Sequence, residues 1–389
     1  ITGGADVQLN QVANTFDVRA VAIDASGLTG TGHFVLTGGV LITGSSVTGT
    51  ANADTVAISS TTGSTYTMGG GDDRLTGSLA DLIASGADDN IINGGDGDDR
   101  ITLDDAATTL TDNHFTQLTS IEELTLAGTD AVSITTGGSF NAAFANGAVI
   151  TNAAAADAKA VSYGMGLSNV DTTIAVTSAG TLNAAGENLS VVTGSGADTV
   201  TITAASMTGV AINASSIMNI NTAAGNDTIT FTYGTLVSDA TAGGVTIDAG
   251  TGKDTITKSA GVNDATAFGV TTYTVQDGDS LAASFDTISG FDLGTAALFA
   301  DSLNFDGTGV TGNTAGTNGT DSGTLKSHAI TSGIITFDDV DTFATAVTIN
   351  SGNLADALAY VATNIGTASD TVAFAYDSTN NGTADGTFV

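Results

Sequence analysis

The sequence predicts an all-β protein built from short strands that tight turns separate. Runs of alternating apolar and polar residues recur along its 389 residues, as at Val35–Thr37, Leu124–Leu126, Val132–Thr135, Val200–Thr203 and Ile229–Thr232. A period of two is typical of strands with one buried face. Clusters of Gly, Asn, Asp and Ser lie between the runs, and most of the 51 Gly residues fall there. Because glycine permits the positive φ angles of turns, these clusters indicate turns and not flexible linkers.

The acidic residues also disfavour helix. The chain has 41 Asp and Glu against 7 Lys and Arg, a formal net charge of -34, and its only Glu residues are Glu122, Glu123 and Glu187. Asp is a poor helix former that suits turns and oxygen-ligand metal sites. Self-repulsion of this size opposes compaction unless cations bind, and it disfavours nucleic acid as a partner. A hydrophobic content of 41% is too high for a disordered chain.

Two segments near the C-terminus depart from the strand pattern. Residues 353–366 predict one short amphipathic helix, with Asn353 as its N-cap and Gly366 as its stop. Its apolar face consists of Leu354, Leu358, Val361 and Ile365. So narrow a face favours packing on a sheet, with partner binding as the alternative. The Gly307–Gly323 stretch is rich in Gly, Thr and Asn without an apolar period, which predicts an exposed loop.

The most specific motif begins at Gly94. Residues 94–102 read Gly-Gly-Asp-Gly-Asp-Asp-Arg-Ile-Thr, a complete match to the nonapeptide G-G-x-G-x-D-x-U-x, in which U is a large apolar residue. The glycines allow a tight turn that points carbonyls at a cation, Asp99 supplies a carboxylate, and Ile101 turns inward on a strand. The predicted calcium-site residues are Gly94, Gly95, Asp96, Gly97 and Asp99.

A second copy lies upstream at residues 69–75, and intermediate positions connect the two. Asp81, Asn90 and Asp99 follow at nine-residue steps, with an Ile two residues after each. This spacing predicts a small stack of turns that share ions, because one turn offers too few oxygens for calcium, which takes roughly 6–8. The predicted metal residues of the stack, besides those from Gly94 on, are Gly69, Gly71, Asp73, Asp81 and Asn90.

Three shorter copies follow at residues 194–200, 223–229 and 250–256. They are predicted to be isolated rather than tandem. Each is either a calcium site or a Gly-Asp turn that only leads into a strand, and Lys253 weakens the third as a cation site. The candidate metal residues here are Gly196, Asp198, Gly225, Asp227, Gly250, Gly252 and Asp254.

These motifs resemble the repeats of the repeats-in-toxin family of secreted calcium-binding proteins. Phe285–Gly294, followed by Asp301–Leu303, is similar to the segment that such proteins place after their repeats, and Ile121–Leu126 is similar to linking strands of bacterial surface-layer members. With abundant Thr, Ala and Gly and no Cys, the resemblance is closest to the lattice-forming region of a surface-layer protein. It implies a calcium-stapled parallel β-roll or β-solenoid with flanking strand-rich segments.

The resemblance also implies a function and a location. It implies export through a type I channel, folding outside the cell once calcium is met, and a place on the surface of a Gram-negative bacterium. The expected function is a self-assembling lattice or sheath that binds several Ca2+ ions and copies of itself, with cell-surface polysaccharide as a further partner through a region outside this chain. The alternative is an adhesin that binds a carbohydrate or host protein through loops such as Gly307–Gly323.

The sequence offers no catalytic motif, so we expect no enzyme activity. His33, His114 and His328 are far apart, and neither H-E-x-x-H nor G-x-S-x-G occurs. Adjacent carboxylates such as Asp72 and Asp73 point in opposite directions on a strand, and the absence of Trp leaves little aromatic surface for a sugar. No apolar run reaches transmembrane length, so membrane insertion is not expected.

The expected organisation has five segments. They are a β-rich segment at 1–66, the calcium-binding β-roll at 67–103, a β-rich segment at 104–190, a degenerate repeat solenoid at 191–260, and a C-terminal β-rich domain at 261–389 that contains the helix.

Overall fold

The computed structural model describes most of the chain and divides it into two compact units. The described residues are all except 1, 11–21, 40–42, 59–62, 84–89, 129–130, 156–160, 179–188, 205–217, 234–244, 260–270, 277, 281–283, 292–300, 306–308, 311 and 366–369. Unit 1 is Ile1–Asn304 and unit 2 is Phe305–Val389, each with its own hydrophobic core. The structure is mostly β, as expected, and unit 1 is a parallel β-solenoid.

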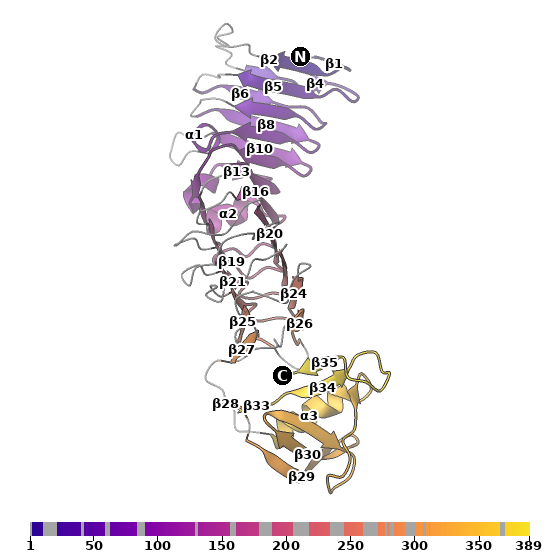
Figure 1. Cartoon of the computed structure of the whole chain (residues 1–389). Coiled ribbons are helices and arrows are strands. Elements are labelled where there is room, and N and C mark those ends of the chain that lie inside the picture. The colour runs from indigo at the N-terminus through magenta and orange to yellow at the C-terminus, as the bar shows by residue number, and fades with distance from the viewer. Residues whose placement is uncertain are drawn as a thin grey trace. The chain divides into compact units, whose positions relative to one another are not determined.

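Two long walls of parallel strands enclose the core of unit 1, and successive turns of the chain lie against one another (Figure 1). One wall is a single sheet, here called sheet 1. Its strands, in order, are β2 (Val7–Asn10), β5 (Phe34–Gly39), β7 (Thr55–Ile58), β9 (Arg74–Gly77), β11 (Arg100–Leu103), β14 (Glu123–Leu126), β16 (Ala148–Ala155), β18 (Thr172–Ser178), β20 (Thr199–Ala204), β22 (Thr228–Tyr233), β24 (Thr255–Ser259) and β26 (Thr287–Ser289).

The opposite wall consists of two sheets. Sheet 2 contains β3 (Ala22–Asp24), β6 (Ser46–Thr48), β8 (Thr65–Gly70), β10 (Ile91–Asp96) and β13 (Leu118–Thr119). Sheet 3 contains β12 (Thr108–Leu110), β15 (Val132–Thr135), β17 (Val161–Gly164), β19 (Leu189–Val192), β21 (Met218–Asn221), β23 (Val245–Asp248), β25 (Thr271–Val275) and β27 (Ser302–Phe305). A short pair, β1 (Thr2–Gly3) and β4 (Gly27–Leu28), lies near the N-terminus of the chain.

The core of the solenoid is built from columns of equivalent apolar residues. In-register pairing places the inward residues of successive sheet 1 strands over one another, and all of them are buried. The members of one column are Ile101, Leu124, Ile150, Ile174, Val200, Ile229 and Ile256. A single turn cannot bury its apolar face alone, so each turn depends on the turns beside it.

Among the described residues of unit 1, three short helical segments lie within the turns. They are α1 (Leu79–Leu82), the 3-10 helix η1 (Asp112–Phe115) and α2 (Gly138–Ala143). The rings of Phe115, Phe140 and Phe144 pack together, with centroids 4.5 to 6.0 Å apart. None of the described helices, in either unit, is long and apolar enough to cross a membrane.

The described residues of unit 2 combine antiparallel and parallel strand pairs with one helix. Its elements are β28 (Gly309–Val310), β29 (Thr314–Ser322), β30 (Leu325–Thr331), β31 (Ile334–Asp338), β32 (Ile349–Asn350), α3 (Leu354–Asn364), β33 (Asp370–Thr371), β34 (Phe374–Asp377) and β35 (Gly386–Phe388). The predicted helix is confirmed as α3, and it packs into the core of this unit. Its fully buried side chains are Ala357 and Tyr360, while Leu354, Leu358, Val361 and Ile365 are partly buried around them.

The predicted loop at Gly307–Gly323 is wrong for most of its length. Residues 314–322 form β29, which pairs with β30 through a tight turn at Gly323, where φ is +57°. Backbone pairing holds this strand in place although most of its side chains are exposed, so it shows no apolar period.

A buried ion pair lies near the last strands of the solenoid. Lys258, on β24, points inward, and its Nζ lies 2.8 Å from both carboxylate oxygens of Asp301. The Oδ1 atom of Asp301 also accepts the backbone N–H of Thr271 at 3.1 Å. A buried pair of opposite charges with complementary hydrogen bonds is tolerated, whereas a single buried charge without its partner is strongly destabilising.

Breaking this pair from one side should therefore destabilise unit 1. We expect Asp301→Ala to lower the free energy of unfolding by about 3–5 kcal/mol, because it leaves a buried, unpaired ammonium group. The double variant Lys258→Met/Asp301→Asn removes both charges and keeps an acceptor for Thr271, so it should recover most of the loss. Urea unfolding measures both, and equal losses in the two variants would contradict the assignment.

Candidate metal centre

The Gly-rich motifs form one corner of the solenoid, where the chain passes from sheet 2 or sheet 3 to sheet 1. The last Asp of each motif comes directly before a sheet 1 strand and points into the interior. Six aspartates at this position are at most 1% exposed. They are Asp54, Asp73, Asp99, Asp198, Asp227 and Asp254.

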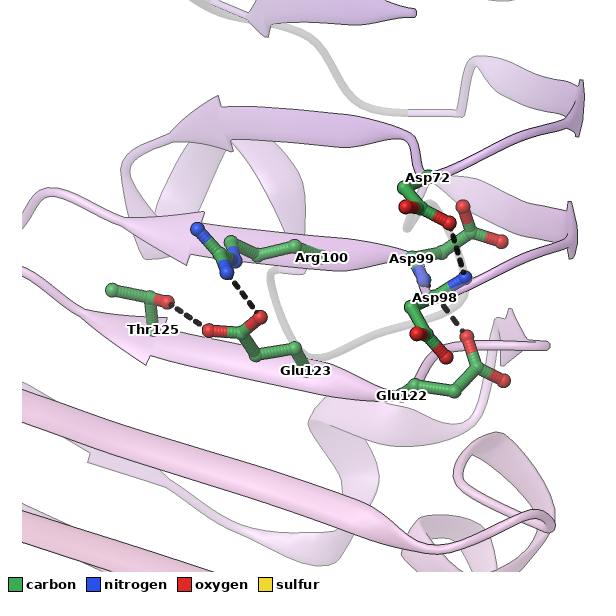
Figure 2. A network of polar contacts seen from close by, with 7 residues as sticks. All are labelled: Asp72, Asp98, Asp99, Arg100, Glu122, Glu123 and Thr125. Carbon is green, nitrogen blue, oxygen red and sulfur yellow. Dashed lines mark hydrogen bonds and ion pairs between the residues drawn. The ribbon is translucent and has the colours of Figure 1, made fainter. Parts of the chain in front are cut away.

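Each of these carboxylates binds the backbone of the preceding turn. The N–H of Asp54 donates to Asp73 Oδ1 at 2.6 Å, and the N–H of Asp73 donates to Asp99 Oδ1 at 2.9 Å. Glu122 ends this run by accepting the N–H of Asp99 at 2.9 Å (Figure 2). Here the runs of linked carboxylates are called the aspartate ladder.

A second run of the ladder repeats the same geometry further along. The N–H groups of Thr172, Asp198 and Asp227 donate to the Oδ1 atoms of Asp198, Asp227 and Asp254, each at 2.7 Å. The N–H of Asp254 then donates to Asp286 Oδ1 at 2.9 Å. The two runs are Asp54, Asp73, Asp99 and Glu122, and Asp198, Asp227, Asp254 and Asp286.

The residues just before Asp99, Asp198 and Asp254 each make a bond in the opposite direction. The N–H of Asp98 donates to Asp72 Oδ1 of the preceding turn at 3.1 Å (Figure 2). Lys253 donates in the same way to Asn226 Oδ1 at 3.0 Å. At these three positions neighbouring turns are therefore joined by a reciprocal pair of bonds, in addition to the sheet pairing.

The glycines of the motif are required because the corners stack in direct contact. Gly95 has φ of +114°, and a Cβ atom on it would lie 2.2 Å from the carbonyl oxygen of Gly69. Gly97 has φ of +137°, and its Cβ would lie 2.3 Å from the oxygen of Gly71. Any other residue would strain the backbone and collide with the turn beside it. This stacking brings the carbonyl groups of successive corners close together.

The ladder leaves some carboxylate oxygens without partners. In the described part of the chain, the buried Oδ2 atoms of Asp73 and Asp99 have no hydrogen-bond partner. Asp54 differs, because its Oδ2 accepts the N–H of Thr50 at 2.6 Å and its Oδ1 accepts the N–H of Phe34 at 2.7 Å. A buried carboxylate oxygen with no donor is costly unless a proton or a cation reaches it.

Burial raises the pKa of the ladder carboxyls. Desolvation raises the pKa of Asp73 to about 8, with further upward contributions from Asp99 and Asp54, although the hydrogen bond from the N–H of Asp54 opposes it. Desolvation likewise raises the pKa of Asp99 to about 6 and those of Asp227 and Asp286 to about 7. Near neutral pH these groups are therefore partly protonated, unlike carboxyls in solvent.

The structure corrects the predicted nine-residue stack. Asp81 lies in α1 and accepts a bond from the hydroxyl of Ser78 at 2.7 Å. Asn90 precedes β10 on the opposite wall, where its Oδ1 accepts the N–H of Ser64 at 2.9 Å. Neither belongs to the ladder, because one turn includes a strand from each wall and so needs many more residues than nine. Ladder neighbours are 19 to 32 residues apart in sequence.

The later motifs, predicted to be isolated, are in fact stacked. Asp198, Asp227 and Asp254 occupy consecutive turns, and Gly252 stands over the carbonyl oxygen of Gly225, which stands over that of Gly196. The reason is again the long turn, which brings distant motifs together. The predicted residue Asp96 is exposed, at the end of β10.

The sequence reasoning missed three ladder members, namely Asp54, Glu122 and Asp286. Two of them carry a detectable signal. Asp54 and Asp286 both begin an Asp-Thr pair followed by Val or Ile, as do Asp198, Asp227 and Asp254. The glycines before them are incomplete, so the nonapeptide pattern does not find them.

The potential donors at the corner are hard oxygens, carboxylate and backbone carbonyl, which are of the kind that Ca2+ binds. The described residues include no group of three or more His, Cys, Asp or Glu side chains placed to hold a metal ion. An ion at this corner would therefore take one carboxylate oxygen from Asp73 or Asp99 and depend on carbonyl groups of the stacked glycines for the rest.

No known family or relative adds to this assignment. A scan against models of protein families gives no match, and neither the curated proteins nor the solved structures contain a significant one.

The raised pKa values predict a pH dependence in the absence of calcium. The folded chain holds a proton that the unfolded chain has lost on Asp99 between about pH 4 and pH 6, and on Asp73 between about pH 4 and pH 8, so the free energy of unfolding should fall as the pH rises through these windows. Urea unfolding in chelator at several pH values measures the slope. Repulsion within a chain of net charge -34 also lowers the free energy of unfolding as the pH rises, so a control is needed to separate the two effects. The control is Asp73→Asn, which should flatten the slope because it removes one of the titrating groups. An unchanged slope in this variant would contradict the assignment.

Proposed function

We propose that this chain is a calcium-dependent, self-assembling structural protein of the bacterial cell surface, without a catalytic role. The observation that carries the proposal is the row of buried carboxylates with unpartnered oxygens, in a chain with a charge of -34. Divalent cations at the corner would neutralise these groups and complete their coordination. Calcium would then act as a staple between turns and make folding depend on the extracellular ion supply.

The ends of the solenoid support the self-assembly part of the proposal. β2 and β26 are the outermost strands of sheet 1 among the described residues, and each has one neighbour in that sheet. Edge strands of this kind pair with other chains unless something protects them. Two copies with this charge repel each other, so a cation between them or a charge-free contact is needed for assembly. The adhesin alternative predicts instead a monomer that needs a separate ligand.

The calcium part is tested with two substitutions in the same ladder. Asp73→Asn removes an unpartnered oxygen, so it should raise stability in chelator at pH 8 and reduce the stabilisation that calcium gives. Binding to the folded form alone contributes about 2.7 kcal/mol per site at a hundredfold excess over Kd. The matched control is Asp54→Asn, in which an amide NH2 replaces the oxygen that accepts the N–H of Thr50. Because this oxygen already has a donor, the variant should be destabilised equally with and without calcium. A wild-type melting temperature that calcium does not raise would contradict the proposal.

Assembly is tested on the whole chain. Millimolar calcium, added to chelator-treated monomer, should produce growing light scattering and ordered sheets or filaments in electron micrographs. Chelation should reverse this, while high monovalent salt should substitute only in part, because it screens repulsion without bridging. A chain that stays monomeric with its calcium sites filled would contradict self-assembly and favour the adhesin.

A further inference from the structure

The outward face of sheet 1 carries a regular array of hydroxyl groups at the C-terminal end of the solenoid. On β18, β20, β22, β24 and β26, alternate residues point away from the core, and in-register pairing aligns them in three rows. The first row is Thr173, Thr199, Thr228, Thr255 and Thr287; the second is Ala175, Thr201, Thr230, Thr257 and Ser289; the third is Thr177, Thr203, Thr232 and Ser259. All of these positions except Ala175 carry a hydroxyl, and this set is here called the threonine array.

The array is regular in two directions. Its register is free of shifts from β18 to β26, whereas the pairing of β16 with β18 contains one. Neighbouring strands lie about 4.8 Å apart and alternate residues about 6.6 Å apart, so the array measures roughly 19 by 13 Å. The column of buried side chains beneath it, including Val200, Ile229 and Ile256, fixes the strands from below.

The array carries no charge, although the chain as a whole is strongly acidic. Upstream on the same face of sheet 1, the first-row positions are Arg74, Arg100, Glu123 and Val149, and Arg100 pairs with Glu123 (Figure 2). In the array itself, the one charged residue of β24, Lys258, points inward. Threonine favours strands in general. The second-row positions on the same upstream strands are already threonine, namely Thr76, Thr102, Thr125 and Thr151, so the array differs from the upstream face in its first row, where Arg and Glu give way to threonine.

The hydroxyl groups are available for a ligand. Every member of the array is partly or fully exposed, and within the described residues their side chains form no hydrogen bond. Threonine is stiff at χ1, so an array of this residue loses little side-chain entropy when it binds.

We propose that the threonine array binds ice. A single hydroxyl contributes only about 0.5–1.5 kcal/mol net, so affinity requires many hydroxyls to be satisfied at once. A regular array of exposed side chains achieves this with a ligand that is itself a two-dimensional lattice of donors and acceptors. Ice presents water oxygens on such a lattice, with repeats of the same order as the strand and residue spacings. A crystalline polysaccharide is also periodic, but its recognition favours aromatic surfaces, and no outward position of the array is aromatic.

The test measures ice growth directly on the whole chain, folded in calcium. Single ice crystals in its presence should develop facets and show a gap between melting and freezing temperatures. Thr230→Lys, in the middle of the array, should abolish both effects because a long charged side chain holds the ice surface away. The matched control is Thr102→Lys, at the equivalent row on β11, which should keep them. Circular dichroism and urea unfolding must show that both variants are folded.

Several outcomes would overturn the proposal. One is that the folded wild-type chain leaves ice growth unaltered. Another is that Thr230→Lys and Thr102→Lys reduce the effect on ice growth equally. Sedimentation with crystalline cellulose or chitin that Thr230→Lys abolishes, without an effect on ice, would assign the face to polysaccharide. Sedimentation velocity that shows only a loss of self-association would assign it to contacts between copies. Conversely, enrichment of the wild type in growing ice, with exclusion of Thr230→Lys, would support ice binding whatever the result for calcium or assembly.

Discussion

The in-register stacking of turns is the constraint on which the rest of this structure depends. It aligns the aliphatic column of sheet 1, it brings the carboxylate of one turn to the backbone N–H of the previous turn, and it leaves no room for a side chain at positions such as Gly95 and Gly97. These features are mutually dependent. A shift of one residue in register would expose the apolar column and break the ladder at the same time.

Stacking also concentrates charge where it is least tolerated. Aspartates of successive turns occupy the same buried corner, so each one raises the cost of ionising the next, in addition to the cost of burial. Backbone N–H groups satisfy one oxygen of Asp73 and of Asp99, and the second oxygen stays without a donor in the described structure. Such a corner favours a bound cation or a proton, which links stability to the ion content and pH of the surroundings.

The same repetition gives the outer faces a composition that changes along the axis of unit 1. In the first outward row of sheet 1, Arg100 and Glu123 form an ion pair, whereas the positions from Thr199 to Thr287 are uncharged. Because equivalent positions repeat with each turn, a preference for one residue type becomes a surface with a fixed period. A solenoid can thus display a periodic surface.

The sequence by itself determined the all-β class, the C-terminal helix and the corner aspartates from Asp73 to Asp254, because strand alternation, helical periodicity and Gly-Asp turns are local patterns. It did not determine which motifs are neighbours. Nine-residue steps suggested that Asp81, Asn90 and Asp99 stack, whereas the structure stacks Asp73 on Asp99 and unites Asp198, Asp227 and Asp254. It also gave no sign that residues 314–322 form a strand. The reason in both cases is that turn length and strand pairing are set by contacts between residues distant in sequence, and only the tertiary structure decides these.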